Sequence, residues 1–301
     1  MVMTATPEAI KRNAHNPDAI VEAGELTDWR FPAGGQMSLR AAKVFHLLIQ
    51  GAGVRITNDT EHRMTYASLN EVFHITIPEL EAVIDELHTT ILKLKLTRED
   101  GTNYIKSGPI LADAERDDEH SSQAELRYTF SPTLRRAIAD SRHWAIISRQ
   151  AVLAFQSKYA LRLYTLISLR VGLRKTSEVF LLEDLRNILG ISPEKYPLFG
   201  NLKQKVLAPA IGEINHLAGF QIGFQPQRHG RSIVAVKLFW GIKGQDARID
   251  ALKELERTKV GRKARREGKT ELIAPDEQIA RHEIALAISH IEARNINDVI
   301  D

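Results

Sequence analysis

Three expected helices followed by an expected hairpin occur twice along this chain, and this repeated order constrains the fold more than any other feature. Apolar residues at helical spacing, with capping residues such as Ser38 and Ser157, predict the helices, and period-two alternation predicts the strands. In the first half the segments are 39–49, 66–73, 78–87 and the hairpin 91–97 with 103–110. In the second half they are 158–169, 182–189, 201–217 and the hairpin 220–224 with 234–240.

This order is typical of the winged helix-turn-helix. The expected fold class is α+β, mainly helical, with two tandem winged helix-turn-helix domains and a helical C-terminal extension. The expected parts are a loose polar leader at 1–36, an N-terminal domain at 37–150, a C-terminal domain at 151–241 and the extension at 242–301.

Two polar regions receive their own interpretation. Residues 112–125 are acidic and lack an apolar period, which predicts an exposed loop before a strand at 126–130 and a helix capped by Ser131. The extension predicts a helix, then a basic run, then an amphipathic helix, at 246–257, 259–269 and 278–291. The basic run could add non-specific DNA affinity or be only a charged linker, and the last helix could dock on this chain or on a partner.

Composition excludes several classes of protein. The chain has no cysteine, which rules out disulfide scaffolds, thiol nucleophiles and cysteine metal sites and favours a reducing compartment. It has no apolar run of about 18 residues and no apolar core typical of a secretory signal. We therefore expect a cytoplasmic protein with no membrane partner.

The net charge of +3 conceals an uneven distribution. Residues 1–156 carry 17 Lys and Arg against 21 Asp and Glu, whereas residues 157–241 carry 12 against 5. A positive charge gathered in one domain of this size is typical of a protein that binds a polyanion, although chance clustering on a solvated surface remains an alternative.

The segment 201–217 has the pattern of a DNA-recognition helix. One stripe is apolar and packs on the domain core, while the opposite face carries hydrogen-bond donors followed by the small residues Ala208 and Gly212, and then Asn215. The turn between the last two strands is cationic and suits a wing on a phosphate or in a minor groove. The expected DNA-binding residues are Lys195, Asn201, Lys203, Gln204, Lys205, Arg228 and Arg231.

Two points remain open in this interpretation. An ordinary amphipathic surface helix and a solvated charged turn would show the same patterns. Pro209 lies inside the expected helix, where proline usually produces a kink, and the sequence offers no physical reason for it.

Four blocks between residues 157 and 241 are specific when taken together: SKYALRLYTLI, FLLEDLRNILGI, YPLFGNLKQKVLAPAIGEIN and GRSIVAVKLFW. In these blocks the chain resembles the replication initiator proteins of iteron-carrying plasmids. The first half resembles them more weakly, chiefly in its order of elements and at 126–134. The chain departs from that pattern in the long extension after the second hairpin.

The resemblance implies a DNA-binding function. It implies that the C-terminal domain reads origin repeats in the major groove, while the N-terminal domain contacts the neighbouring turn and serves dimerisation. Monomers would bind the direct repeats and open the origin, and dimers would repress the protein's own gene. The implied partners are double-stranded DNA, a second copy of the chain, the host replication initiator and the replicative helicase.

No enzyme motif is complete. A Walker A pattern ending at Lys269 would need glycine at position 263, where the chain has Lys263, and His282 has no second histidine at metalloprotease spacing. None of the 11 histidines lies two residues from another, so a His-x-His metal site is missing. We expect no enzymatic activity, no metal and no cofactor. The alternatives are a winged-helix transcriptional repressor without a replication role, and an interaction scaffold that binds no DNA.

Overall fold

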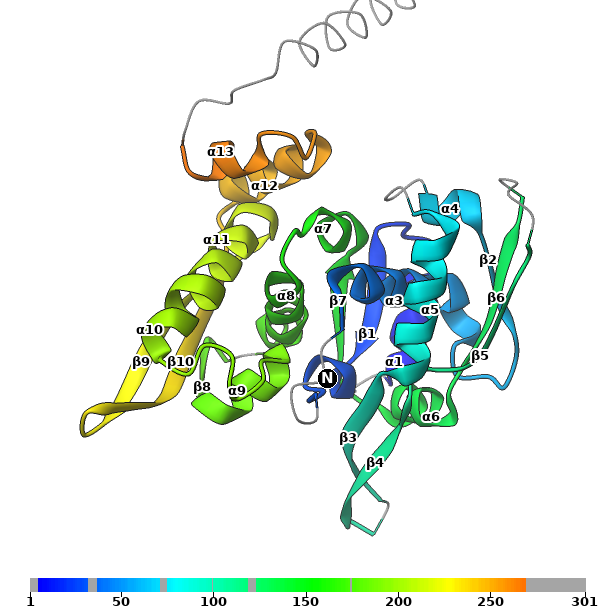
Figure 1. Cartoon of the computed structure of the whole chain (residues 1–301), viewed down its shortest axis with the longest axis horizontal. Helices are drawn as coiled ribbons and strands as arrows, with labels where there is room; N and C mark the ends of the chain where they lie inside the picture. Colours follow the sequence, from blue (N-terminus) through cyan, green and yellow to red (C-terminus); the bar gives the residue numbers. More distant parts are fainter. Residues whose placement is uncertain are drawn as a thin grey trace, which may run out of the picture. The chain divides into compact units, whose positions relative to one another are not determined.

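The computed structural model describes residues 5–31, 37–70, 75–98, 100–118, 123–173 and 175–268 (Figure 1). The chain divides into two units, residues 1–256 and residues 257–301. In the described ranges no helix is long and apolar enough to cross a membrane.

Both expected winged helix-turn-helix domains are present in the first unit. The first domain contains α3 (Leu39–Ala52), α4 (Tyr66–Asn70) and α5 (Ile77–Thr89), with η2 (Gly53–Arg55) after α3. Its sheet has the order β2-β6-β5, formed by His62–Thr65, Glu125–Phe130 and Leu111–Arg116. Ser38 caps α3 as predicted, because its hydroxyl oxygen accepts the amide N–H of Ala41 at 3.0 Å.

The expected first hairpin is present but is not the wing of this domain. Strands β3 (Ile91–Thr97) and β4 (Asn103–Pro109) form a separate two-stranded antiparallel sheet between α5 and β5. The wing is formed by β5 and β6, so the prediction of a loop over 112–125 is wrong at its start. Cross-strand ion pairing explains the acidic strand, since Glu115 lies 2.8 Å from the Arg127 guanidinium.

The prediction of a loose leader is wrong for residues 5–31. Here α1 (Thr6–Asn13), β1 (Ala19–Ala23) and α2 (Gly24–Thr27) join the fold, and β1 pairs with β7 (Trp144–Ser148). Ile20 and Ile147 are opposite each other in this pair, and both are fully buried. The partner strand lies more than 100 residues away, so local patterning does not show the pairing. The rest of the expected leader, 1–4 and 32–36, lies outside the described residues.

The second domain follows α6 (Pro132–Asp140) and α7 (Arg149–Ala154). It contains α8 (Lys158–Val171), α9 (Leu182–Leu189) and a long third helix, with a sheet of order β8-β10-β9. These strands are Ser177–Leu181, Ser232–Ile242 and Phe220–His229. The wing strands run farther than predicted, because the turn needs only Gly230, with φ of +60°, and the residue after it.

Helix α8 also packs on the first domain. The Arg162 guanidinium donates hydrogen bonds to the carbonyl oxygens of Leu26 (2.9 Å), Trp29 and Ile188 (3.1 Å), and it lies over the Trp29 ring at 5.4 Å. Desolvation lowers the pKa of Arg162 to about 10, so the side chain stays protonated at neutral pH.

The extension begins as predicted. Helix α12 (Gln245–Glu256) closes the first unit, and the short α13 (Arg262–Arg266) lies in the basic run within the second unit. The expected helix over 278–291 lies outside the described residues.

Replacing Arg162 tests how strongly the two domains depend on this contact. Arg162→Met removes the donors to three carbonyl groups, and we expect the free energy of unfolding to fall by about 3 kcal/mol. Urea denaturation measures the change, with Arg142→Met, at an exposed position, as the control. A loss below about 1 kcal/mol would contradict the role given to Arg162.

Candidate nucleic-acid interface

The third helix of the second domain separates a buried stripe from an exposed polar face. All the residues predicted for the apolar stripe are buried, namely Leu202, Val206, Leu207, Ala210, Ile211, Ile214 and Leu217. Three consecutive side chains, those of Lys203, Gln204 and Lys205, are exposed, as is Asn201 one turn before. The amphipathic helix is therefore confirmed, and its donors face outward near its N-terminal end.

The helix is not a regular α-helix. It comprises α10 (Phe199–Leu202), a π turn at Lys203–Leu207 and α11 (Ala208–Leu217), and in the π turn the amide of Ala208 donates to the carbonyl oxygen of Lys203. A π turn inserts one extra residue into an α-helix and is frequent at functional sites.

Pro209 gives the π turn a physical cause. Its ring nitrogen has no hydrogen to donate, and in a regular α-helix the ring would collide with the carbonyl group four residues earlier, that of Lys205. The wider turn lies immediately before the proline and replaces the α-helical pairing there. It also rotates the residues before it by about 100° relative to an uninterrupted helix. Pro209 therefore determines which side chains of 201–205 face outward together.

The loop before this helix is fixed by Arg186 of α9. Its guanidinium donates to the carbonyl oxygens of Ser192 (2.9 Å), Pro193 (3.2 Å), Lys195 and Tyr196 (3.1 Å). Tyr196 has φ of +56°, an uncommon backbone conformation for a residue other than glycine. The arginine thus holds the backbone that presents the exposed Lys195.

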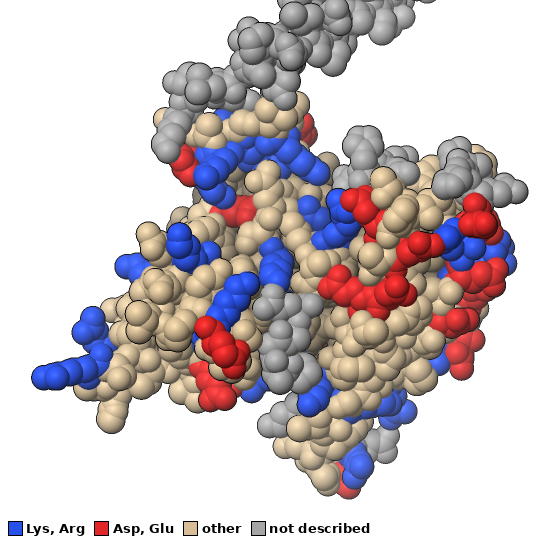
Figure 2. Space-filling view, viewed as in Figure 1, with Lys and Arg blue, Asp and Glu red and all other residues tan. Residues whose placement is uncertain are grey.

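The wing carries the other predicted cations. Arg228 lies at the end of β9, Arg231 lies in the turn, and both are exposed. Figure 2 shows Lys and Arg gathered at this end of the hairpin. Within the described residues, none of the five predicted cations of the helix, its lead-in and the wing has a carboxylate within ion-pairing distance. Their charge is therefore available to an anion.

Asn215 differs from its expected place on the outer face. Its side-chain amide donates to the carbonyl oxygen of Ile222 at 2.9 Å, and its oxygen accepts the Ile222 amide at 2.7 Å, so Asn215 fixes the start of β9. Lys243 also donates to the Asn215 carbonyl oxygen at 2.7 Å. Sequence reasoning missed Arg186 and Lys243, because both act on backbone carbonyls that only the tertiary structure brings near.

The arrangement offers exposed hydrogen-bond donors and positive charges that can bind an anion. In the described ranges no cluster of three His, Asp or Glu side chains could hold a metal ion. The exposed helix face and the wing lie on neighbouring elements of one domain, which is how winged helices present one element to a groove and the other to the adjacent backbone.

Comparison with known proteins agrees with this architecture. Residues 19–168 match the family described as "Initiator Replication protein, WH1", and residues 181–240 match "Initiator Rep protein, WH2". Among curated proteins no relative matches.

Two solved structures are similar to the chain. One is the Pi initiator protein in complex with iteron DNA, with a TM-score of 0.55, 19% identity, and coverage of 76% of this chain and 98% of that one. The other contains domains 2 and 3 of RctB, with a TM-score of 0.41, 11% identity, and coverage of 67% and 80%. The first likeness supports the fold of two tandem winged-helix domains. By its two family matches, this chain belongs to the initiator replication proteins.

Proposed function

We propose that this protein is a plasmid DNA replication initiator that binds direct repeats, or iterons, at the origin. The proposal rests on the exposed row Lys203, Gln204 and Lys205 and on the cationic wing beside it. In the part of the chain that the structure describes, neither lysine has a carboxylate at ion-pairing distance. Membership of the initiator family supports it, as does the likeness in fold to the Pi initiator, whose structure contains iteron DNA.

In this proposal the second domain reads the repeat. The helix enters the major groove, where Lys203 and Lys205 can donate to guanine O6 and N7 and Gln204 can bind adenine N6 and N7. Ala208 and Pro209 are exposed on the same helix and have short side chains, so the backbone can approach the groove. Arg228 and Arg231 on the wing contact an adjacent phosphate or minor groove.

The later steps of initiation follow from binding. We propose that binding to several repeats deforms the duplex and opens the origin. No catalytic residue of this chain is needed for this step, because the free energy of binding offsets the cost of bending and unstacking the DNA. The host initiator and the replicative helicase are the proposed partners in the cytoplasm, and a dimeric form would repress the protein's own gene.

Two other functions make different predictions. A winged-helix repressor would bind one palindrome, whereas an initiator binds a series of repeats and gives a ladder of shifted bands. An interaction scaffold would bind no DNA with sequence preference. The exposed cations on the helix and the wing, which have no ion-pair partner among the described residues, favour the DNA-binding functions.

The proposal is tested by titrating the protein with its own upstream DNA and with a scrambled duplex of equal length, from about 50 to 300 mM salt. With about 6 phosphates neutralised, log K should fall with log salt at a slope near −5. Native DNA should be preferred by at least about 10³-fold. Equal, weak binding to both duplexes would refute sequence-specific reading.

The same titration identifies the surface of the protein that binds the repeat. In Lys203→Gln/Lys205→Gln we expect native affinity to fall by about 10- to 100-fold, because two donors to the groove or backbone are lost. Lys11→Gln/Lys253→Gln removes two exposed lysines from α1 and α12 and should leave affinity within about twofold. If both double variants lost the same amount of affinity for native DNA, net charge alone would account for binding.

Pro209→Ala separates helix geometry from helix charge. Without the proline, 201–217 can form a regular α-helix, and Asn201 to Lys203 then rotate away from their present face. We expect native affinity to fall by at least about tenfold while affinity for scrambled DNA stays within about twofold, since no charge changes. Unchanged preference for native DNA would show that the π turn has no role in reading.

A further inference from the structure

The two winged-helix domains carry opposite charge at equivalent places. Helix α5 occupies in the first domain the place that α10–α11 occupies in the second, since each is the third helix before the wing. Between Ile77 and Thr89, α5 has four acidic residues and no Lys or Arg. Figure 2 shows Asp and Glu gathered over this part of the molecule.

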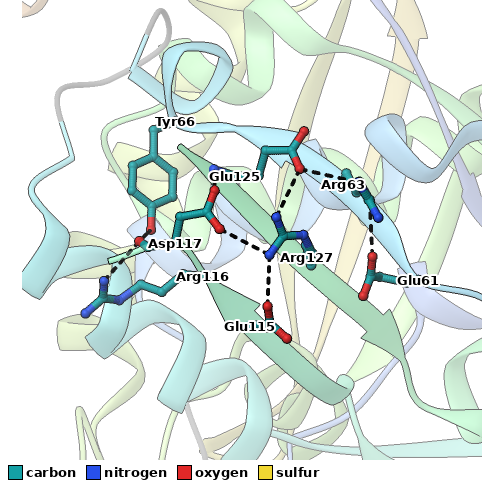
Figure 3. Close-up of polar contacts among 8 residues, drawn as sticks. All are labelled: Glu61, Arg63, Tyr66, Glu115, Arg116, Asp117, Glu125 and Arg127. Carbon is teal, nitrogen blue, oxygen red and sulfur yellow. Dashed lines mark hydrogen bonds and ion pairs between the residues drawn. The ribbon is translucent and has the colours of Figure 1, made fainter. Parts of the chain in front are cut away.

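The arginines near α5 and the first wing already form ion pairs with carboxylates of the same domain. Arg127 lies between Glu115 at 2.8 Å, Asp117 at 3.1 Å and Glu125 at 3.6 Å (Figure 3). Arg116, also on this sheet, forms ion pairs with Glu81 and with Asp118. These guanidinium groups neutralise carboxylates of their own domain and are not available to phosphates.

Two carboxylates of this region, those of Glu79 and Asp117, have pKa values lowered by hydrogen bonds and nearby arginines. Hydrogen bonding from Thr76, followed by the Arg40 guanidinium, lowers the pKa of Glu79 to about 2. The amide of Glu125 lowers the pKa of Asp117. A negatively charged helix and wing of this kind repel the DNA backbone.

The β3–β4 hairpin of the same domain has the opposite character. Lys93 and Arg98 are exposed and Lys106 is partly exposed, and within the described residues none of the three has a carboxylate at ion-pairing distance. The Arg98 guanidinium lies 5.0 Å from the centre of the Tyr104 ring, which restricts its motion. Asp100 in the turn accepts the amide of Thr102 at 2.8 Å.

The hairpin also lies beside the DNA-reading domain. An open groove of about 1280 Å³ has Lys93 and Ile105 of the hairpin on one side, and Leu181 of β8 and Asp184 of α9 on the other. Strand β8 is the edge of the sheet opposite β9. Strand β9 belongs to the wing, so the β3–β4 hairpin lies near one edge of the second domain's sheet and the wing forms its other edge. A DNA duplex that extends beyond a single major groove can contact both the β3–β4 hairpin and the wing.

We propose that the first domain grips the phosphate backbone of the duplex through the β3–β4 hairpin, with Lys93, Arg98 and Lys106, and not through α5 or the β5–β6 wing. This inference rests on the proposed function, because it names a second contact with the same DNA. The contact supplies affinity without sequence preference, since phosphates carry no base information.

The test uses the full chain with Lys93→Gln/Arg98→Gln/Lys106→Gln. Removing three backbone contacts should make the salt slope shallower by about 2 to 3 and weaken binding by about tenfold or more near 150 mM salt. The loss should be equal on native and scrambled DNA. Ethylation interference should show the lost phosphates outside the groove read by the second domain.

A matched variant adds charge where we expect no DNA. Ala82 and Asp85 are exposed on α5, and Ala82→Lys/Asp85→Lys should change affinity by less than about twofold, since charges beyond the Debye length of about 8 Å are screened. Circular dichroism and thermal melting establish that each variant is folded.

The outcomes separate this inference from the proposed function. If the wild type prefers native DNA but the hairpin variant keeps the wild-type slope, or the α5 variant binds at least about tenfold more tightly, the hairpin contact is wrong and the function stands. If the wild type shows no preference for native DNA, the proposed function fails.

Discussion

The guanidinium of Arg162 joins helix α8 of the second domain to carbonyl groups of the first, and the remaining structure depends on this contact. Because α8 is also the first helix of the second winged-helix domain, the residue that ties the two domains together lies in the core that supports the recognition helix. Tyr164, two residues after Arg162 on α8, accepts the amide N–H of Ser148 at 3.0 Å and adds a second contact between α8 and the first domain. The most specific block of the sequence, around 157–167, is therefore structural.

The two winged-helix domains share a fold but differ in the charge of their third helix and wing. Among the residues that the structure describes, the lysines and arginines of the second domain's third helix and wing have no carboxylate partner, whereas in the first domain Arg116 and Arg127 form ion pairs with acidic side chains. Two winged-helix domains can thus keep the same order of elements while their third helices and wings expose faces of opposite charge. Pro209 adds a second distinction, because the π turn it requires gives the reading helix a face that the regular α5 does not have.

Much of the fold was predictable because its signals are local. Serine caps and apolar periodicity placed α3, α8, α9 and the first hairpin close to their observed bounds. Pairing of β1 with β7 and the acidic strand β5 were missed, since each depends on a distant partner. At the site, the amphipathic pattern predicted an exposed polar face, but in a regular α-helix Lys203 would lie with the apolar stripe, so its exposure depends on the π turn. The π turn and the hydrogen bonds of Arg186 to the preceding loop depend on backbone geometry that residue patterns do not encode.

The central claim is that the helix around Lys203–Lys205 reads base edges in the major groove. Methylation interference on the protein's upstream DNA tests it most directly, because methylation of guanine N7 blocks only the major-groove edge. We predict that methylation at a few guanines in each repeat prevents binding, and that Lys203→Gln/Lys205→Gln loses part of this pattern. If only phosphate ethylation interfered and N7 methylation had no effect, the helix would not be reading the major groove, and the claim would be contradicted.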